Sequence, residues 1–406
     1  MAKKLPFQWV ILLLCWLVFF AIRLLSFAII PLMFAVEHEF HLTADQIAIL
    51  ISIPSLLTLA LSFGAGAIGL AIGIRATVGM ATLTVCISGV LMYLADGYPS
   101  LLISRILLGI GSNLAGPNLA PMIGAWFTSK KRPIALGIYT TAIHVSDIVN
   151  TLVTVPLLQI LGSWRNPYLI YTTIMLAFTF MWFILARLPH ANFAQNGLES
   201  RRLWHISLKT AVGTVLKSKN IWCLSVATFF DSVAAIGIVT LIPIINLVFK
   251  GLDPAAASFA AFPFYFGTVV AMLVWAPISS MLQSRKITFI LHSILTTMLY
   301  YLITLIPAEP LGLYMVFMFI TGLLSAWFPP LNNTYIMELP EVGPMLSPAA
   351  LGLTNFFGMG MGGFIGPLLM GYVPYMADLI TIYVIFMAVS TIFYLPLTET
   401  YKKKQR

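Results

Sequence analysis

Long apolar runs, separated by short polar segments, make up most of this chain of 406 residues. A helix that crosses the hydrocarbon core of a membrane needs roughly 20 apolar residues, and nearly every run reaches that length. The runs cover residues 8–34, 46–72, 76–95, 99–127, 133–161, 167–187, 221–248, 256–283, 287–306, 311–336, 347–373 and 379–397. None shows the strict alternation of a membrane β-strand. The pattern predicts an all-α integral membrane protein with twelve transmembrane helices.

Composition agrees with this interpretation, because 60% of the residues are hydrophobic and only 9% are charged. Soluble domains carry about 25% charged residues. No clustered nucleophile or metal-ligand set is visible, and no Gly-Lys-Ser/Thr phosphate loop is present. We therefore expect neither an enzyme nor an ATP-driven pump, with no cofactor, no metal and no nucleic-acid partner.

The Lys and Arg residues set the orientation of the spans. With the N-terminus in the cytoplasm, every Lys and Arg outside the spans falls on the cytoplasmic side, except Arg165 and Lys250. Arg23 and Arg105 lie within spans. This agreement with the positive-inside rule predicts that both termini are cytoplasmic, in an inner (plasma) membrane of bacterial type.

The longest hydrophilic stretch, residues 188–220, divides the chain into two sets of six spans. We predict an N-terminal six-helix bundle over 1–187, a cytoplasmic linker over 188–220 and a C-terminal six-helix bundle over 221–406. One helical face of the linker carries four apolar residues, Leu208, Val212, Val215 and Leu216. That face predicts a short amphipathic helix on the inner membrane surface, with a solvated linker as the alternative.

The two halves repeat one spacing in their fourth spans. Gly109 precedes Pro117 by eight residues, and Gly322 precedes Pro330 by eight residues. Parallel halves of six helices are one of the ways in which secondary transporters are built.

Several motifs then resemble the major facilitator superfamily. Arg105 and Gly109 resemble the Arg-x-x-x-Gly pattern of its fourth span, and Gly162-Ser-Trp-Arg165 resembles the turn before its sixth. The loop after the second span keeps the glycines and a final arginine, Gly73 and Arg75 among them, but has Leu70 and Ala71 in place of the family's Asp-Arg pair. The resemblance implies two pseudo-symmetric six-helix bundles that work by alternating access, commonly as a monomer. It also implies structural or gating roles for Arg105, Gly109, Gly73 and Arg75.

Within that superfamily the chain is most similar to cyanate and nitroimidazole permeases and to nitrate porters. The stretches that carry this likeness are Ile22-Arg23, Ser52-Ile-Pro-Ser-Leu56 and Gly137-Ile-Tyr-Thr-Thr141. Nitrate porters hold their anion with arginines in the second and eighth spans, and this chain has no arginine in either, which argues against nitrate.

Ionisable residues within spans are the strongest candidates for function, because each costs at least about 3 kcal/mol at the bilayer centre. Arg23 lies near the middle of the first span, where its planar guanidinium suits a carboxylate or a small oxyanion. A structural ion pair with Asp147 or Asp231 is the alternative.

His144 and Asp147 are three residues apart, so they share one helix face and form a candidate proton carrier. His144 fits a hydrogen-bonded core histidine equally well. Asp231, in the seventh span, is the only buried acid predicted for the second half. It is a candidate proton site, a candidate partner of Arg23 in substrate binding, or a structural residue.

The uncharged candidates for substrate binding are Asn113, Asn118, Trp327 and Phe328. Membrane helices use Asn and Trp for packing just as often. Together the sequence predicts a secondary active transporter of a small polar, anionic solute, coupled to protons, whose partners are that solute and the lipid bilayer. The alternatives are an exporter of hydrophobic or cationic compounds, and a membrane sensor that does not transport.

Overall fold

The computed structural model describes residues 7–61, 68–69, 72–127, 132–187, 213–325, 329–373 and 375–401. These residues form helices and turns, and no β-strand occurs among them. Eleven helices in the described part of the chain are long and apolar enough to cross a membrane, and Leu311–Leu324 is a shorter apolar helix. The predicted all-α membrane fold is confirmed, and the twelve predicted spans agree with these helices.

The chain divides into two compact units, unit 1 (Met1–Arg202) and unit 2 (Leu203–Arg406). The division falls within the linker predicted at 188–220. Residues 188–212 lie outside the described residues, so the amphipathic helix predicted there stays a prediction, as do the bundle boundaries at 187 and 221.

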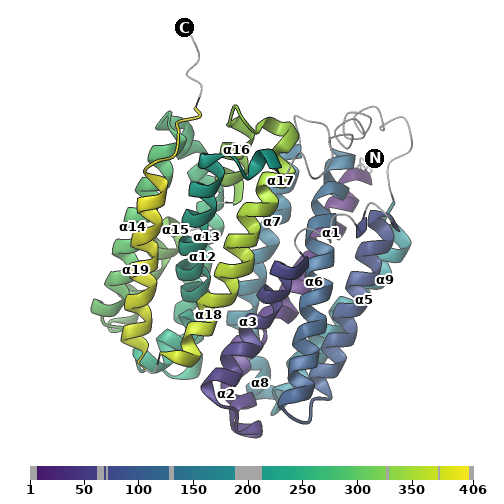
Figure 1. Ribbon diagram of the computed structural model, residues 1–406. Coiled ribbons are helices and arrows are strands. Elements are labelled where there is room, and N and C mark those ends of the chain that lie inside the picture. The colour runs from purple at the N-terminus through teal and green to yellow at the C-terminus, as the bar shows by residue number, and fades with distance from the viewer. Residues whose placement is uncertain are drawn as a thin grey trace, which may run out of the picture. The chain divides into compact units, whose positions relative to one another are not determined.

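Unit 1 carries its described helices in the order α1 (Phe7–Phe27), α2 (Ile29–Phe40), α3 (Ala44–Leu61), α5 (Ile74–Tyr93), α6 (Tyr98–Trp126), α7 (Arg132–Val149), η1 (Asn150–Thr154), α8 (Val155–Leu161) and α9 (Arg165–Leu185). Within the unit, α1 packs against α6, α7 and α9 (Figure 1). Helix α5 packs against both α6 and α9, and α3 packs against α6.

Two places in unit 1 have a proline in or next to helical backbone. Helix α1 ends at Phe27 and α2 begins at Ile29, just before Pro31. Pro54 lies inside α3. Because proline has no N–H, it leaves the carbonyl four residues earlier without its helical partner, and that carbonyl needs another donor.

Unit 2 carries α12 (Lys219–Ile244), η3 (Ile245–Phe249), α13 (Pro254–Met281), α14 (Arg285–Leu305), α15 (Leu311–Leu324), α16 (Pro329–Glu338), α17 (Gly343–Asn355), η4 (Phe356–Gly362), α18 (Gly363–Tyr372) and α19 (Met376–Tyr394). Helix α12 packs along α19 and against α18 and η4, and α14 packs on the other side of α19 (Figure 1). Helix α13 packs along α15.

In the tenth span the structure differs from the sequence analysis. The run 311–336 was expected as one helix, but it contains two, α15 and α16. Two consecutive prolines, Pro329 and Pro330, start the second helix. Neither proline can donate a backbone N–H, and a proline disfavours helical backbone at the residue before it, so the α-helix cannot continue through them.

Three spans contain a π-helical turn among the described residues: η1, η3 and η4. η1 and η4 join directly onto α-helix at both ends, while η3 forms the last turn of the helix that begins with α12. Such turns widen the helix locally and are often found at functional sites. The first of them, η1, begins at Asn150, three residues after Asp147.

A polar network closes one end of unit 2. The carboxylate of Glu399, which follows α19, accepts hydrogen bonds from the N–H groups of Arg285 (2.8 Å) and Lys286 (3.3 Å) and from the Ser284 hydroxyl. Arg285 in turn pairs with Glu338 at the end of α16, with 3.0 Å between Nη2 and Oε1. The chain after α19 therefore caps the N-terminus of α14, where helix N–H groups favour an anion.

We expect Glu399→Gln to destabilise the folded chain by about 1 kcal/mol at neutral pH, since solvent screens this half-exposed cap. Partial burial alone would raise the pKa of Glu399, but hydrogen bonds from Ser284 and from nearby N–H groups lower it below its ordinary 4.5. A carboxyl group whose pKa is lower in the folded chain than in the unfolded chain stabilises the fold at pH values above its unfolded pKa. That stabilisation is lost as the pH falls through the folded pKa. Thermal unfolding between neutral and acid pH measures the difference.

The matched control for this prediction is Glu309→Gln, in the loop before α15, where the glutamate caps no helix in the described contacts. The difference between parent and Glu399→Gln should shrink as the pH falls below about 4.5. An equal loss of stability in both variants, or a difference independent of pH, would contradict the cap.

Candidate functional site

Helices α1 and α7 pack against each other through aromatic and polar contacts that fix their relative register. The Trp16 indole donates a hydrogen bond to the Thr141 hydroxyl at 3.1 Å. The Phe19 and Tyr139 rings stack with their centroids 4.9 Å apart. One to two turns further along, this packing brings Arg23 of α1 next to the face of α7 that carries His144 and Asp147.

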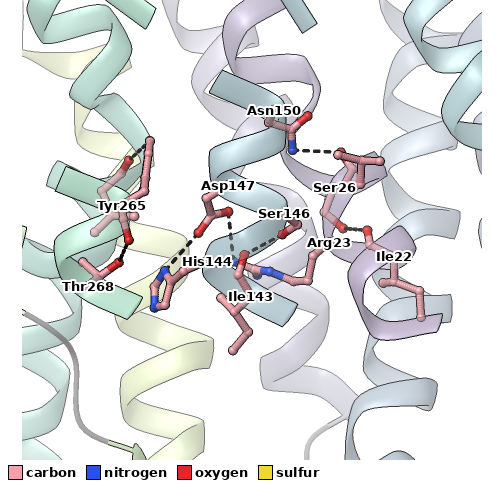
Figure 2. A network of polar contacts seen from close by, with 12 residues as sticks. Ile22, Arg23, Ser26, Ile143, His144, Ser146, Asp147, Asn150, Tyr265 and Thr268 are labelled. Atoms are coloured by element: carbon pink, nitrogen blue, oxygen red, sulfur yellow. Dashed lines mark hydrogen bonds and ion pairs between the residues drawn. The ribbon is translucent and has the colours of Figure 1, made fainter. Parts of the chain in front are cut away.

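Asp147 lies between His144 and Arg23 (Figure 2). Its Oδ2 is 3.2 Å from the His144 Nδ1, and its Oδ1 is 3.9 Å from the Arg23 Nη2. The Asp147 side chain is 3% exposed and the Arg23 side chain 25%. The structure thus brings together three of the residues that the sequence predicted.

Arg23 makes only a loose contact with Asp147. A distance of 3.9 Å is an ion pair without a hydrogen bond. Its Nε is buried and has no hydrogen-bond partner among the described residues. The guanidinium lies over the Phe27 ring, 4.0 Å from the centroid, which holds one of its faces. The planar guanidinium therefore keeps donor capacity that suits an anionic group.

Asp147 also keeps unused hydrogen-bonding capacity, because its Oδ1 accepts no hydrogen bond from the described chain. The carboxylate can share a proton with the His144 imidazole, and it can neutralise Arg23. These two interactions use different oxygens of one carboxylate, so Asp147 joins His144 and Arg23 in one polar network.

Arg105 donates to backbone rather than to a carboxylate. Its Nε donates to the Leu50 carbonyl at 2.8 Å, and its Nη1 donates to the Ser26 carbonyl at 2.8 Å. Leu50 lies four residues before Pro54, so its carbonyl is the one that the proline leaves without a helical partner. Arg105 is 3% exposed and ties α6 to α1 and α3. This geometry supports the structural role predicted for it.

The two predicted asparagines of α6 donate to backbone carbonyls as well. Asn113 Nδ2 donates to the carbonyls of Pro54 (3.2 Å) and Gly109 (2.8 Å). Asn118 Nδ2 donates to Leu114 at 2.9 Å, and a Cβ placed on Gly69 would lie 1.7 Å from its Oδ1. These contacts are structural, and substrate binding by either residue stays a prediction.

The remaining structural candidates of unit 1 lie at helix contacts. A Cβ on Gly109 would lie 3.0 Å from the Pro54 backbone, so this glycine lets α6 approach α3. Gly73 precedes α5 with a φ of 89°, which glycine adopts readily. Arg75 hydrogen-bonds the Phe183 carbonyl, and its own carbonyl accepts from Trp182 at 3.0 Å. Leu70 and Ala71 lie outside the described residues.

Asp231 belongs to unit 2, in the middle of α12. It is 2% exposed, and its Oδ2 accepts a hydrogen bond from the Tyr394 hydroxyl of α19 at 3.1 Å. Its pairing with Arg23 stays a prediction. Trp327 and Phe328 lie outside the described residues.

Sequence reasoning missed three residues that these sites use. Asn150 Nδ2 donates to the Leu24 carbonyl at 3.1 Å, one residue past Arg23 on α1. Phe27 supplies the ring beneath Arg23, and Tyr394 supplies the hydroxyl at Asp231. Phe27 lies four residues after Arg23, so helical spacing could have indicated it. Asn150 carries an amide in the middle of a span, which is a weak sign of function. Nothing in the sequence around Tyr394 indicates its contact with Asp231.

Comparison with known families gives one match that covers most of the chain. The sequence model described as Major Facilitator Superfamily matches residues 15–367. A search of curated protein sequences finds no match.

Solved structures with the same fold include two kinds of transporter. A bacterial homologue of the human lysosomal transporter Spinster, inward-facing and unoccupied, is 14% identical, with a TM-score of 0.72 over 97% of each chain. A D-xylose–proton symporter is 13% identical, with a TM-score of 0.74 over 98% of this chain and 99% of that one. At these identities the likeness concerns the fold. None of the findings supports the narrower likeness to cyanate, nitroimidazole or nitrate carriers.

Proposed function

The chain belongs to the Major Facilitator Superfamily, a family of membrane transporters, and from this premise we propose that it moves a small anionic solute together with protons by alternating access. The observation that carries the proposal is the loosely held guanidinium of Arg23 beside the His144–Asp147 pair. The orientation with both termini in the cytoplasm is part of the proposal.

Arg23 supports an anion as the solute. It is a permanent charge in the middle of a span, and its buried Nε has no described partner. Leaving such donors unpaired costs free energy, which a bound carboxylate or small oxyanion recovers through two parallel N–H···O bonds. Phe27 covers one face of the guanidinium. This arrangement favours a planar, compact anionic group approaching the edge of the fork.

The position of Asp147 supports coupling to protons, because Asp147 and a bound anion would both interact with the positive charge of Arg23. An anion bound at Arg23 places a second negative charge near Asp147, and this charge favours protonation of the His144–Asp147 pair. The proton and the anion then bind together, and their charges cancel as a neutral set. Movement of a neutral set across a membrane avoids the cost of carrying an unpaired charge.

We expect Arg23→Gln to abolish anion-dependent stabilisation and to reduce uptake more than tenfold, because Gln has neither the charge nor the fork. Thermal unfolding of the purified protein with formate, acetate, benzoate and cyanate measures binding. Uptake into proteoliposomes, with and without an inward proton gradient, measures transport. Arg23→Lys is the matched control, since it keeps the charge but cannot bind in a bidentate way.

The Asp147→Asn variant distinguishes proton coupling from anion binding in the same unfolding and uptake assays. If Asp147 carries the coupling, this variant still binds the anion but loses the response to the proton gradient. An anion that stabilises parent and Arg23→Gln equally would make Arg23 structural. Stabilisation by lipophilic cations in place of anions would favour an exporter of hydrophobic or cationic compounds.

A further inference from the structure

A second buried acid, Asp231, lies in unit 2. Its Oδ2 accepts one hydrogen bond, from Tyr394, and its Oδ1 is buried with no hydrogen-bond partner among the described residues. Tyr300 of α14 also lies close enough to interact electrostatically with the carboxyl group. The hydrogen-bond partner that the described residues give Asp231 is therefore a phenol and not a cation.

The described helices packed against α12 offer Asp231 no counter-charge, and α14, which carries Tyr300, has its basic residues Arg285 and Lys286 in its first turn. The elements of unit 2 packed against α12 are α13, α17, α18, α19, η3 and η4. Apart from Asp378 of α19, none of them contains Lys, Arg, His, Asp or Glu. Within α12 the only other charged residue is Lys219, twelve positions away, or about 18 Å along the helix.

The other titratable groups near this region have partners of their own. Tyr383 of α19 donates to the Gly366 carbonyl at 2.5 Å, and Tyr265 of α13 donates to the Val239 carbonyl at 2.8 Å. His292 of α14 lies edge-on to the Trp275 ring. Among the described residues of unit 2, no Lys, Arg or His forms an ion pair with the Asp231 carboxylate.

A carboxylate in such a place is unfavourable. One hydrogen bond does not offset the loss of hydration of a full charge, and no cation is present to neutralise it. Uptake of a proton removes the charge and leaves a carboxyl group that can both donate and accept in a hydrogen bond with Tyr394. Deep burial of an acid among apolar and phenolic groups is a known way to keep it neutral near pH 7.

We propose that Asp231 is a second proton-binding site, contained within unit 2, with Tyr394 as its positioning residue. The proton held here is distinct from the one proposed for the His144–Asp147 pair. Because the carboxyl lies between α12 and α19, the proton can exchange with water only when that contact opens. The proposal does not depend on the identity of the solute or on anion transport.

Difference infrared spectroscopy of the purified full-length protein tests this site directly. A protonated carboxyl group has a C=O stretch that a carboxylate lacks. At neutral pH we expect this band in the parent and in Asp147→Asn, and we expect it to be lost in Asp231→Asn. Asp378→Asn is the matched control on α19 and should keep the band. Carboxylate bands in place of the C=O band in the parent-minus-Asp231→Asn spectrum would overturn the proposal.

Tyr394→Phe tests the positioning role without removing the acid. Loss of a donor to the charged form should shift the C=O band and move its disappearance to higher pH. An unchanged band position and titration would show that Tyr394 does not position the proton. This variant also keeps the test possible if Asp231→Asn does not fold.

Thermal unfolding across pH gives an independent readout. If the folded chain holds a proton that the unfolded chain releases, stability of the parent falls as the pH rises. Asp231→Asn should remove that slope and be the more stable protein at alkaline pH. The same slope in parent and variant would overturn the proposal. Failure of anion transport with the infrared band intact would reject the proposed function and leave this site standing.

Discussion

Replacing Arg105 with methionine is expected to destabilise the folded chain by about 3 kcal/mol, because it leaves the carbonyls of Leu50 and Ser26 without their donor. Methionine fills a similar volume with no charge, so the loss of hydrogen bonds dominates over the loss of packing. Thermal or denaturant unfolding of the purified protein measures the effect.

The same structure predicts that the effect depends on Pro54. Pro54→Ala restores an N–H four residues after Leu50, and this N–H can satisfy the Leu50 carbonyl without Arg105. The cost of Arg105→Met should therefore fall by about 1 kcal/mol in the Pro54→Ala background. Pro121→Ala in α6 is the matched control, because it also removes a proline from a helix interior but leaves the Leu50 carbonyl unchanged. Equal costs in all three backgrounds would contradict this account of Arg105.

Gly322→Ala is expected to destabilise unit 2 by about 3 kcal/mol, at the upper end of the range for overpacking. A Cβ at this position would lie 2.0 Å from the Phe264 carbonyl oxygen and 2.8 Å from its carbonyl carbon. These are backbone atoms of α13, so no side-chain rotation relieves the clash. Gly267 of α13 makes the reciprocal approach, with its Cβ position 2.4 Å from the Phe319 carbonyl oxygen.

Gly312→Ala provides the control on the same helix. A Cβ at Gly312 meets no atom within 4 Å, so the change adds helix propensity without a clash. We expect Gly312→Ala to be neutral or slightly stabilising, while Gly322→Ala lowers the unfolding temperature clearly. If the two variants unfold at the same temperature, α13 and α15 do not pack through their backbones.

The sequence was sufficient for the spans because apolar length is a local property that each segment carries by itself. It was also sufficient to place His144 and Asp147 on one face, since helical spacing fixes residues three apart. The fold and the family resemblance were confirmed on that basis. The break in the tenth span was readable in principle from Pro329 and Pro330, whose lack of N–H groups outweighs the apolar pattern.

Contacts between helices could not be read in the same way. The loose pairing of Arg23 with Asp147 depends on the register of α1 against α7, which aromatic stacking and one hydrogen bond determine. Tyr394 meets Asp231 across 163 positions of sequence, and nothing local to either residue indicates the other. Substrate binding by Asn113 stays a prediction, because an amide in a span can hydrogen-bond either a solute or the backbone of a neighbouring helix. The hydrogen bond from Asn113 to the Pro54 carbonyl across two helices could not be read from the sequence.

The π-helical turns η1, η3 and η4 have a consequence for how these spans can change in length. A π turn holds one residue more than the α turn it replaces. Deleting one residue there converts it to an α turn and leaves the faces of the flanking segments unrotated. Deleting one residue elsewhere in a span rotates everything beyond it by about 100°. A one-residue deletion in the fifth or eleventh span is therefore tolerable at Asn150–Thr154 or Phe356–Gly362, because the helical segments on either side keep their faces.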